Sequence, residues 1–234
     1  MTTTKELFEH PFSKLIIDDN LIDKKTTTEL EIYRNNSMFY SVHFFSLLMQ
    51  LENAVELFSK YNYTKNDNIG RGFHLTYNYE NYLIRIVSLS DRLLQTINAI
   101  YDLGIDEKDV KERLIFNNAK VKKTEIEAKY KIFNKTISEF IGNRNQIIHR
   151  HSLITDEISR LEKLYHPVLT ESYLIGKSED VIQSFKYIRK IELTKFIKET
   201  KSKFKIKNTE IYYSLIPIFD ILLQKYEENK KNIA

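Results

Sequence analysis

The chain has 234 residues, of which 42% are hydrophobic and 29% are charged, as expected for a globular protein with one or two domains. It has no cysteine, which excludes disulfides and thiolate metal sites and predicts a cytoplasmic protein in a reducing compartment. Five glycines and three prolines are too few for the many tight turns of an all-β fold. No apolar run approaches the ~18 residues that a membrane span needs, so we expect a soluble, all-α protein with long helices.

Residues 1–28 contain two threonine runs and Pro11 around a short apolar patch, which predicts an N-terminal arm that packs locally. The first long helix is expected within 29–60, because apolar residues recur there at spacings of three and four. This predicted stripe contains Met38, Val42, Phe45, Met49, Ala54, Leu57 and Phe58. His43 lies in the same helix beside Phe44, where a packed imidazole is expected rather than a ligand.

An asparagine-rich loop, residues 61–72, separates this helix from the best-defined one, expected over 76–103. Gly104 is placed to cap the end of that helix. Asp106 is a candidate N-cap for a shorter helix, and a third long helix is expected over about 121–141. Together these elements predict a helical core over residues 29–176, built as an antiparallel bundle.

The C-terminal region, residues 177–234, predicts additional helices that pack on the same domain. Its basic strip, residues 177–207, holds ten basic and four acidic residues, a local charge of +6 that exceeds the +4 of the whole chain. Such a strip can follow a phosphate backbone, with Lys186, Arg189 and Lys190 as candidate nucleic-acid-binding residues. A solvated helix face is the alternative. A final helix is expected over about 209–229, with a kink at Pro217.

Polar and ionisable residues interrupt apolar helical positions most densely over residues 139–151. Gly142 and Asn143 are expected to break the preceding helix, and Arg144 and His149 follow with the spacing Arg-x4-His. Asn145 stands directly after the arginine. Spacing alone has a high false-positive rate, since Arg160 and His166 match a related spacing on an ordinary stretch. The break before Arg144 and the polar residue after it distinguish the first match.

This combination resembles the HEPN superfamily, whose members carry Arg-x4-6-His, often with Asn or Asp after the arginine. The block of residues 79–94 also looks like the early core helix of a bacterial HEPN branch. The resemblance implies an all-α bundle of HEPN type and a homodimer in which two motifs form one groove. It also implies a metal-independent endoribonuclease without a cofactor. A stress, toxin–antitoxin or phage-defence setting, with an antitoxin as a possible protein partner, is implied only by the family.

The residue types suit this chemistry. An imidazole titrates near neutral pH, so His149 is a candidate general acid or base, and Arg144 can hold phosphate oxygens with its planar guanidinium. Asn145 is a candidate for orienting the phosphate or His149. Arg150 and His151 add phosphate contacts or face water. Some HEPN toxins have a tyrosine two residues after the histidine, and His151 stands there instead, which puts inactivation by tyrosine modification in doubt.

Two alternatives remain open from the sequence. The first is a non-catalytic HEPN-like module that binds nucleic acid or a partner protein through the basic strip. The second is a helical structural or assembly protein in which Arg144 and His149 only pack. Other enzyme classes find little support, because the chain has no Walker loop, dinucleotide-binding glycine fingerprint, His-Glu-x-x-His or Gly-x-Ser-x-Gly motif.

Overall fold

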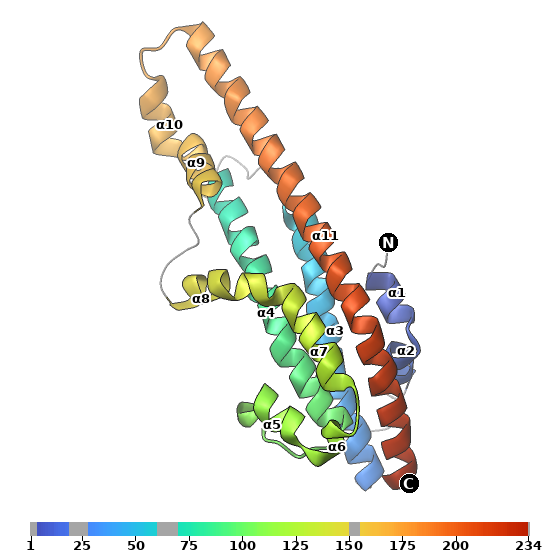
Figure 1. The fold of residues 1–234 in the computed structure, drawn as a ribbon. Helices are drawn as coiled ribbons and strands as arrows, with labels where there is room; N and C mark the ends of the chain where they lie inside the picture. Colours follow the sequence, from blue (N-terminus) through green and yellow to red (C-terminus); the bar gives the residue numbers. More distant parts are fainter. Residues whose placement is uncertain (1–3, 19–27, 60–69, 150–154, 234) are drawn as a thin grey trace. The chain divides into compact units, whose positions relative to one another are not determined.

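The computed structural model describes residues 4–18, 28–59, 70–149 and 155–233 of the chain. In these ranges the regular elements are all helical and there is no strand, which confirms the all-α prediction (Figure 1). The α-helices are α1 (Thr4–Glu9), α2 (Pro11–Asp18), α3 (Glu29–Leu57), α4 (Arg71–Ile100), α5 (Glu112–Asn117), α6 (Ala119–Lys122), α7 (Ile126–Ile137), α8 (Ile141–His149), α9 (Asp156–Tyr165), α10 (Pro167–Leu174) and α11 (Glu179–Ile233). The described helices include none with both the length and the apolar character needed to span a membrane.

The chain forms two compact units, each assembled from separate stretches of sequence. Unit 1 contains residues 1–52, 85–140 and 207–234, and unit 2 contains residues 53–84 and 141–206. Each of the long helices α3, α4 and α11 is divided between the two units. The expected division into an arm, a core and a C-terminal region follows sequence order, and it stays a prediction.

Unit 1 has an aromatic core in which α2, α3 and the C-terminal part of α11 meet. Phe12, Phe44, Phe45 and Phe219 are all buried. The ring centroid of Phe219 lies 5.3 Å from that of Phe12 and 5.7 Å from that of Phe45. Full burial of a large apolar side chain contributes roughly 1.5–3 kcal/mol, so these rings hold the three helices together.

The buried stripe of α3 differs from the predicted one. Phe45, Ala54 and Phe58 are buried as predicted, but Val42, Met49 and Leu57 are 38%, 50% and 60% exposed. The buried face also includes residues that were not predicted, namely Ser37, Ser41, Phe44, Leu48, Leu51 and Val55. Ser41 is tolerated there because its hydroxyl donates to the carbonyl oxygen of Ser37 at 2.8 Å, which satisfies its polar group within the helix. A prediction based on the spacing of apolar residues cannot identify Ser37 and Ser41 as buried positions.

Helix α4 carries most of its predicted apolar face inside, including Tyr82, Ile86 and Ile97, but it begins about five residues earlier than expected. The predicted cap at Gly104 is wrong. Asp102 has φ +48° and closes the helix, and the N–H of Leu103 donates to the carbonyl oxygen of Asn98 at 3.0 Å. Aspartate tolerates the left-handed conformation better than most residues, and Gly104 also adopts it, with φ +67°, two residues after the one that closes the helix.

Unit 2 has a smaller core at the N-terminal part of α4. It consists of Phe58, Leu75, Leu161, Leu193 and Ile197, with Tyr79, Tyr165 and Phe196 packed against it. Helix α4 approaches α9 closely at Gly72, where a Cβ atom would lie 2.7 Å from the Cα of Glu162. The Thr76 hydroxyl donates to Oε1 of Glu162 at 2.7 Å. This contact fixes the start of α4 against α9.

Helix α11 corrects the prediction for the C-terminal region. The sequence predicted several helices, with the last over about 209–229, but residues 179–233 form one α-helix of 55 residues with Pro217 inside it. Phe204, within the charged stretch 201–207, is buried and stacks on Tyr82, with ring centroids 3.6 Å apart. Helix α9 is capped by Thr155, whose side-chain oxygen accepts from the N–H of Ile158.

Candidate active site on helix α8

The predicted motif lies within one short helix of unit 2. The expected break at Gly142 and Asn143 is displaced: the chain turns through the 3₁₀ segment η3 (Ser138–Phe140), and α8 then begins at Ile141. Arg144, Asn145 and His149 therefore all stand on α8. The interruption thus begins four residues before Gly142, and the motif lies in the helix that follows it.

Arg144 is held by its neighbour and has spare hydrogen-bonding capacity. Its Nη1 donates to Oδ1 of Asn145 at 3.1 Å. Its Nε is buried and has no acceptor among the described residues. Within the same residues, no carboxylate lies at ion-pairing distance from the Arg144 guanidinium. A buried N–H without an acceptor is rare in proteins and indicates strain, function or an absent ion. The guanidinium is thus not consumed by a structural salt bridge in the described part of the chain.

His149 is exposed and is the last residue of α8. Residues five apart on an α-helix point about 140° away from one another. The structure therefore brings Arg144 and Asn145 together, but it does not place Arg144 and His149 on one face of a single helix. Arg150 and His151, the remaining candidates of this stretch, lie outside the described residues.

Helix α8 has little packing of its own. None of its nine residues is buried, and Ile141 and Ile148 are 38% and 44% exposed. Isolated helices of this length are marginal in water, because most helix stability in proteins comes from packing an apolar face. The exposed isoleucines give α8 an apolar surface next to its ionisable residues.

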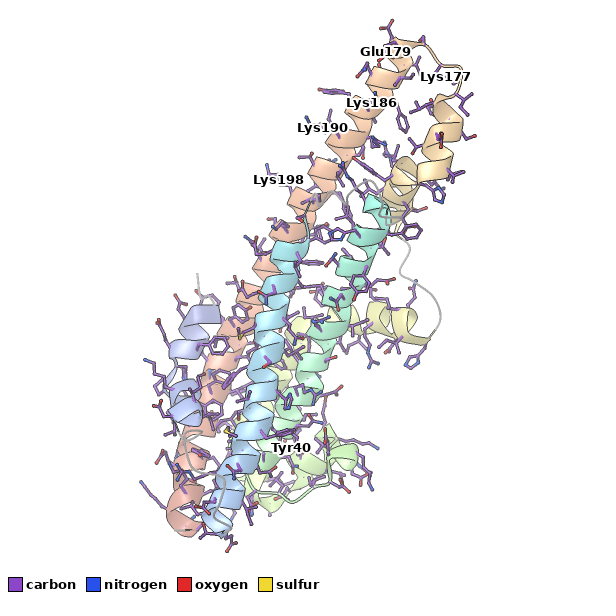
Figure 2. All side chains as sticks on the ribbon, turned by 180° about the vertical axis from the view of Figure 1, so that it is seen from behind. Tyr40, Lys177, Glu179, Lys186, Lys190 and Lys198 are labelled. Carbon is purple, nitrogen blue, oxygen red and sulfur yellow. The ribbon has the colours of Figure 1, made fainter. Side chains whose placement is uncertain are left out.

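The basic strip is divided by its contacts. Lys201 and Lys205 both lie 3.1 Å from carboxylate oxygens of Glu56, and hydrogen bonds from these two lysines lower the pKa of that carboxyl group. Lys186 and Lys190 are exposed, and with Lys198 they follow one another along α11 (Figure 2). The N-terminal part of the strip is therefore the part available to an anionic ligand.

Arg189 differs from its lysine neighbours because it packs on aromatic rings. Its guanidinium carbon lies 4.8 Å from the ring centroid of Tyr165 and 5.9 Å from that of Phe185. The Arg71 guanidinium carbon lies 5.6 Å from the same Tyr165 ring. Burial raises the pKa of Tyr165, which opposes the effect of the two arginines, and its hydroxyl donates to the carbonyl oxygen of Arg189 at 2.9 Å.

Sequence reasoning missed Arg71 and Tyr165. Together with Lys186, Arg189 and Lys190 they line a hollow of about 350 Å³ in unit 2. Arg71 was assigned to a loop because glycine stands on both sides of it. An arginine at the first position of a long helix was the available signal, whereas nothing in the sequence around Tyr165 indicated a site.

A family model for the Cthe2314-like HEPN domain matches residues 60–206, which is more than half of the chain. The chain belongs to the HEPN superfamily. No curated protein matches it, and no solved structure matches it. The matched stretch includes α8 and all five residues named for the hollow.

Membership in the HEPN superfamily narrows the functional classes. HEPN domains often act as dimers, and the domain points to a nuclease or nucleotide-binding role. In the described ranges of this HEPN chain, no three His, Asp or Glu side chains gather closely enough to hold a metal ion. The reaction and the partners have to be argued from the residues.

Proposed function

We propose that this HEPN protein is a metal-independent endoribonuclease that works as a homodimer in the cytoplasm, with Arg144 and His149 as its catalytic residues. The observation that carries the proposal is the state of Arg144. Its guanidinium is bound to Asn145, its Nε has no acceptor among the described residues, and His149 is exposed on the same helix. A purely structural pair would place at least one of them in a satisfied, buried contact.

The chemistry requires only an RNA substrate and these side chains. A neutral His149 takes the proton from the 2′-hydroxyl, whose oxygen attacks the adjacent phosphorus and forms a 2′,3′-cyclic phosphate. The bond to the 5′-oxygen breaks, and a protonated imidazole gives that oxygen its proton. The Arg144 guanidinium binds the non-bridging oxygens, where negative charge increases in the transition state. Asn145 positions the Arg144 guanidinium through its side-chain oxygen.

The geometry of α8 supports the proposed dimer. One α8 helix directs Arg144 and His149 about 140° apart, so a groove that contains both needs a second wall. Association of two α8 surfaces through Ile141 and Ile148 would bury their exposed apolar area and bring two motifs together. One His149 then acts as base while the partner subunit's His149 acts as acid.

Other residues have supporting roles in this proposal. Arg150 and His151 would extend the phosphate contacts beyond α8, and Lys186, Arg189 and Lys190 would hold the RNA further along its backbone. A toxin or defence role, regulated by an antitoxin or another protein partner, is consistent with an RNase whose activity has to be controlled.

A second candidate function is RNA binding without cleavage. It is favoured by the exposed Lys186 and Lys190 on α11, which are independent of α8. Binding through these lysines would fall steeply as the salt concentration rises, and His149→Ala would leave it unchanged. A purely structural role for the motif is less favoured, because neither Arg144 nor His149 is fully buried.

The test is cleavage of cellular RNA in EDTA by the wild-type protein, Arg144→Lys and His149→Ala. We expect His149→Ala to lower the rate by about 10²–10⁴-fold, as for loss of a general acid or base. Arg144→Lys should also be slow, because an ammonium group keeps the charge but lacks the bidentate fork.

Two matched variants control for the loss of an exposed side chain. His43 was expected to be packed but is exposed on α3, where its ring contacts Phe39 with centroids 4.4 Å apart. Arg113 is exposed on α5. His43→Ala and Arg113→Ala should cleave at the wild-type rate. Equal activity of His149→Ala and His43→Ala, with both proteins folded, would reject the catalytic assignment.

A further inference from the structure

We propose that the hollow lined by Arg71, Tyr165, Lys186, Arg189 and Lys190, the basic pocket, holds a backbone phosphate of the RNA substrate. This inference rests on the proposed function for its ligand, but the pocket itself is built by α4, α9 and α11 without any residue of α8. The proposed subsite combines residues of the basic strip on α11 with Arg71 and Tyr165, which lie outside the strip.

The charge of the basic pocket selects an anion. Two arginines and two lysines line it together with Tyr165, Leu193 and Thr194, and no carboxylate belongs to the lining. In the described part of the chain, none of these four cations lies at ion-pairing distance from an aspartate or glutamate. Four uncompensated positive charges around one hollow of about 350 Å³ produce a strongly positive potential.

The other hollows of unit 2 differ in this respect. One, lined partly by Arg160 and Lys195, also contains Asp156, Glu157 and two further glutamates. Another, along Lys190, Lys195 and Lys198, is lined by α11 alone and includes Glu199. The basic pocket is distinguished from both because it combines residues of three helices and has no acidic group in its wall.

The arginines are positioned before a ligand arrives. Tyr165 lies against the guanidinium groups of both Arg71 and Arg189, and Phe185 lies against the second of them. An aromatic contact restricts the rotation of a guanidinium while leaving its N–H groups free to donate, so less entropy is lost when it binds an anion. Arg71 is also the first residue of a 30-residue helix, whose positive dipole end attracts anions.

A phosphate fits these features better than a base. The guanidinium groups already lie against the ring of Tyr165, which a stacked base would have to displace. Planar guanidinium groups bind phosphate oxygens in pairs, and the exposed lysines add charge at the rim. The basic pocket therefore holds the backbone and reads no sequence.

The test uses full-length protein carrying His149→Ala, so that RNA binding is measured without cleavage. A fluorescein-labelled single-stranded RNA is titrated at several salt concentrations with this protein and with the added changes Arg71→Gln, Lys190→Gln or Lys198→Gln. Lys198 is the matched control, because it is an exposed lysine of α11 that does not line the basic pocket. Thermal unfolding verifies that each variant is folded.

We expect Arg71→Gln and Lys190→Gln each to weaken RNA binding about tenfold and to reduce the slope of log K against log salt by about 0.7, the value for one lost phosphate contact on a single strand. Lys198→Gln should change both quantities less. If all three variants behave alike, or if folded Arg71→Gln binds as tightly as its parent, the basic pocket is not a phosphate subsite.

The result is separable from the catalytic proposal. A wild-type protein that binds RNA through Arg71 and Lys190 but never cleaves it would reject the RNase reaction and support the basic pocket. Cleavage that depends on His149, together with RNA binding that is insensitive to Arg71→Gln, would support the RNase reaction and reject the basic pocket. Binding of inorganic phosphate is followed through shifts of the Arg71 and Arg189 Nε–H resonances. If phosphate shifts these resonances but Arg71→Gln leaves RNA affinity unchanged, RNA is rejected as the ligand.

Discussion

Gly72 and Gly142 both lie inside helices, but an added methyl group would meet different surroundings at each. A Cβ at Gly72 would lie 2.7 Å from the backbone Cα of Glu162, whereas one at Gly142 would have no neighbour within 4 Å. We expect Gly72→Ala to lower the free energy of unfolding by about 1–3 kcal/mol through overpacking. Gly142→Ala should raise it by about 0.5–1 kcal/mol, since alanine favours a helix.

Chemical denaturation of the two variants measures both changes in the same protein. Opposite signs would support the close α4–α9 contact, and a stabilising Gly72→Ala would contradict it. The sequence predicted a loop up to Gly72, whereas α4 already begins at Arg71, and residues 61–69 of the predicted loop lie outside the described residues. The sequence does not show that Gly72 contacts Glu162. That contact depends on how α9, which lies about ninety residues later in the chain, packs back on α4.

At the scale of helices, a hydrogen-bonded tyrosine connects α7 to both α4 and α5 in unit 1. The hydroxyl of Tyr130 donates to Oε1 of Glu112 at 3.0 Å and lies 2.5 Å from Oγ of Ser90. Burial raises the pKa of Tyr130, and the Glu112 carboxylate adds to the increase, so the phenol remains a proton donor. Tyr101 is equally buried, but within the described residues its hydroxyl hydrogen-bonds only to the Thr124 hydroxyl, at 2.9 Å.

We expect Tyr130→Phe to lower the free energy of unfolding by about 1.5–3 kcal/mol, because it removes a hydrogen bond to a charged group. Tyr101→Phe is the matched control and should lower it by about 0.5–1.5 kcal/mol, the usual value for a neutral pair. Urea unfolding followed by circular dichroism compares them. A larger loss for Tyr101→Phe would show that the contact with Glu112 contributes little.

Long helices with regular apolar faces were predictable, as the buried face of α4 shows, whereas the single helix predicted over about 121–141 is divided among α6, α7 and η3. Prediction was weaker where a polar residue replaces an apolar one in the core, as at Ser37 and Ser41 of α3. It was also weaker for α11, where charges over 201–207 hid the helical period around Phe204. In each case packing between distant helices decided the outcome, and local residue type did not.

At the scale of the whole molecule, the proposed catalysis depends on a dimer. If α8 forms the dimer contact, a charge at Ile148 should prevent association without unfolding either unit, because Ile148 is 44% exposed. Ile148→Lys is therefore expected to elute as a monomer in size-exclusion chromatography with light scattering and to lose RNA cleavage. Ile132→Lys, at a 58% exposed position of α7, should remain dimeric and active. A dimeric Ile148→Lys protein would place the interface elsewhere.

The candidate site was only partly predictable. The residue types and spacing of Arg144, Asn145 and His149 indicated a HEPN motif, and family membership is confirmed over residues 60–206. The position of the helix interruption and the exposure of α8 were not evident, because both depend on the turn at Ser138–Phe140. Arg71 and Tyr165 were missed for the same kind of reason, since they meet Arg189 only in the folded unit.

The most direct measurement is the chemical identity of the RNA ends produced in EDTA by the wild-type protein and by His149→Ala. The proposed reaction predicts a 2′,3′-cyclic phosphate on one product and a 5′-hydroxyl on the other. It also predicts that His149→Ala slows cleavage by at least about 10²-fold, and that no cleavage occurs at a nucleotide that carries a 2′-O-methyl group. Cleavage that leaves a 3′-hydroxyl, cleavage at a 2′-O-methyl nucleotide, an undiminished rate in His149→Ala, or a wild-type dimer that leaves RNA intact would contradict the account.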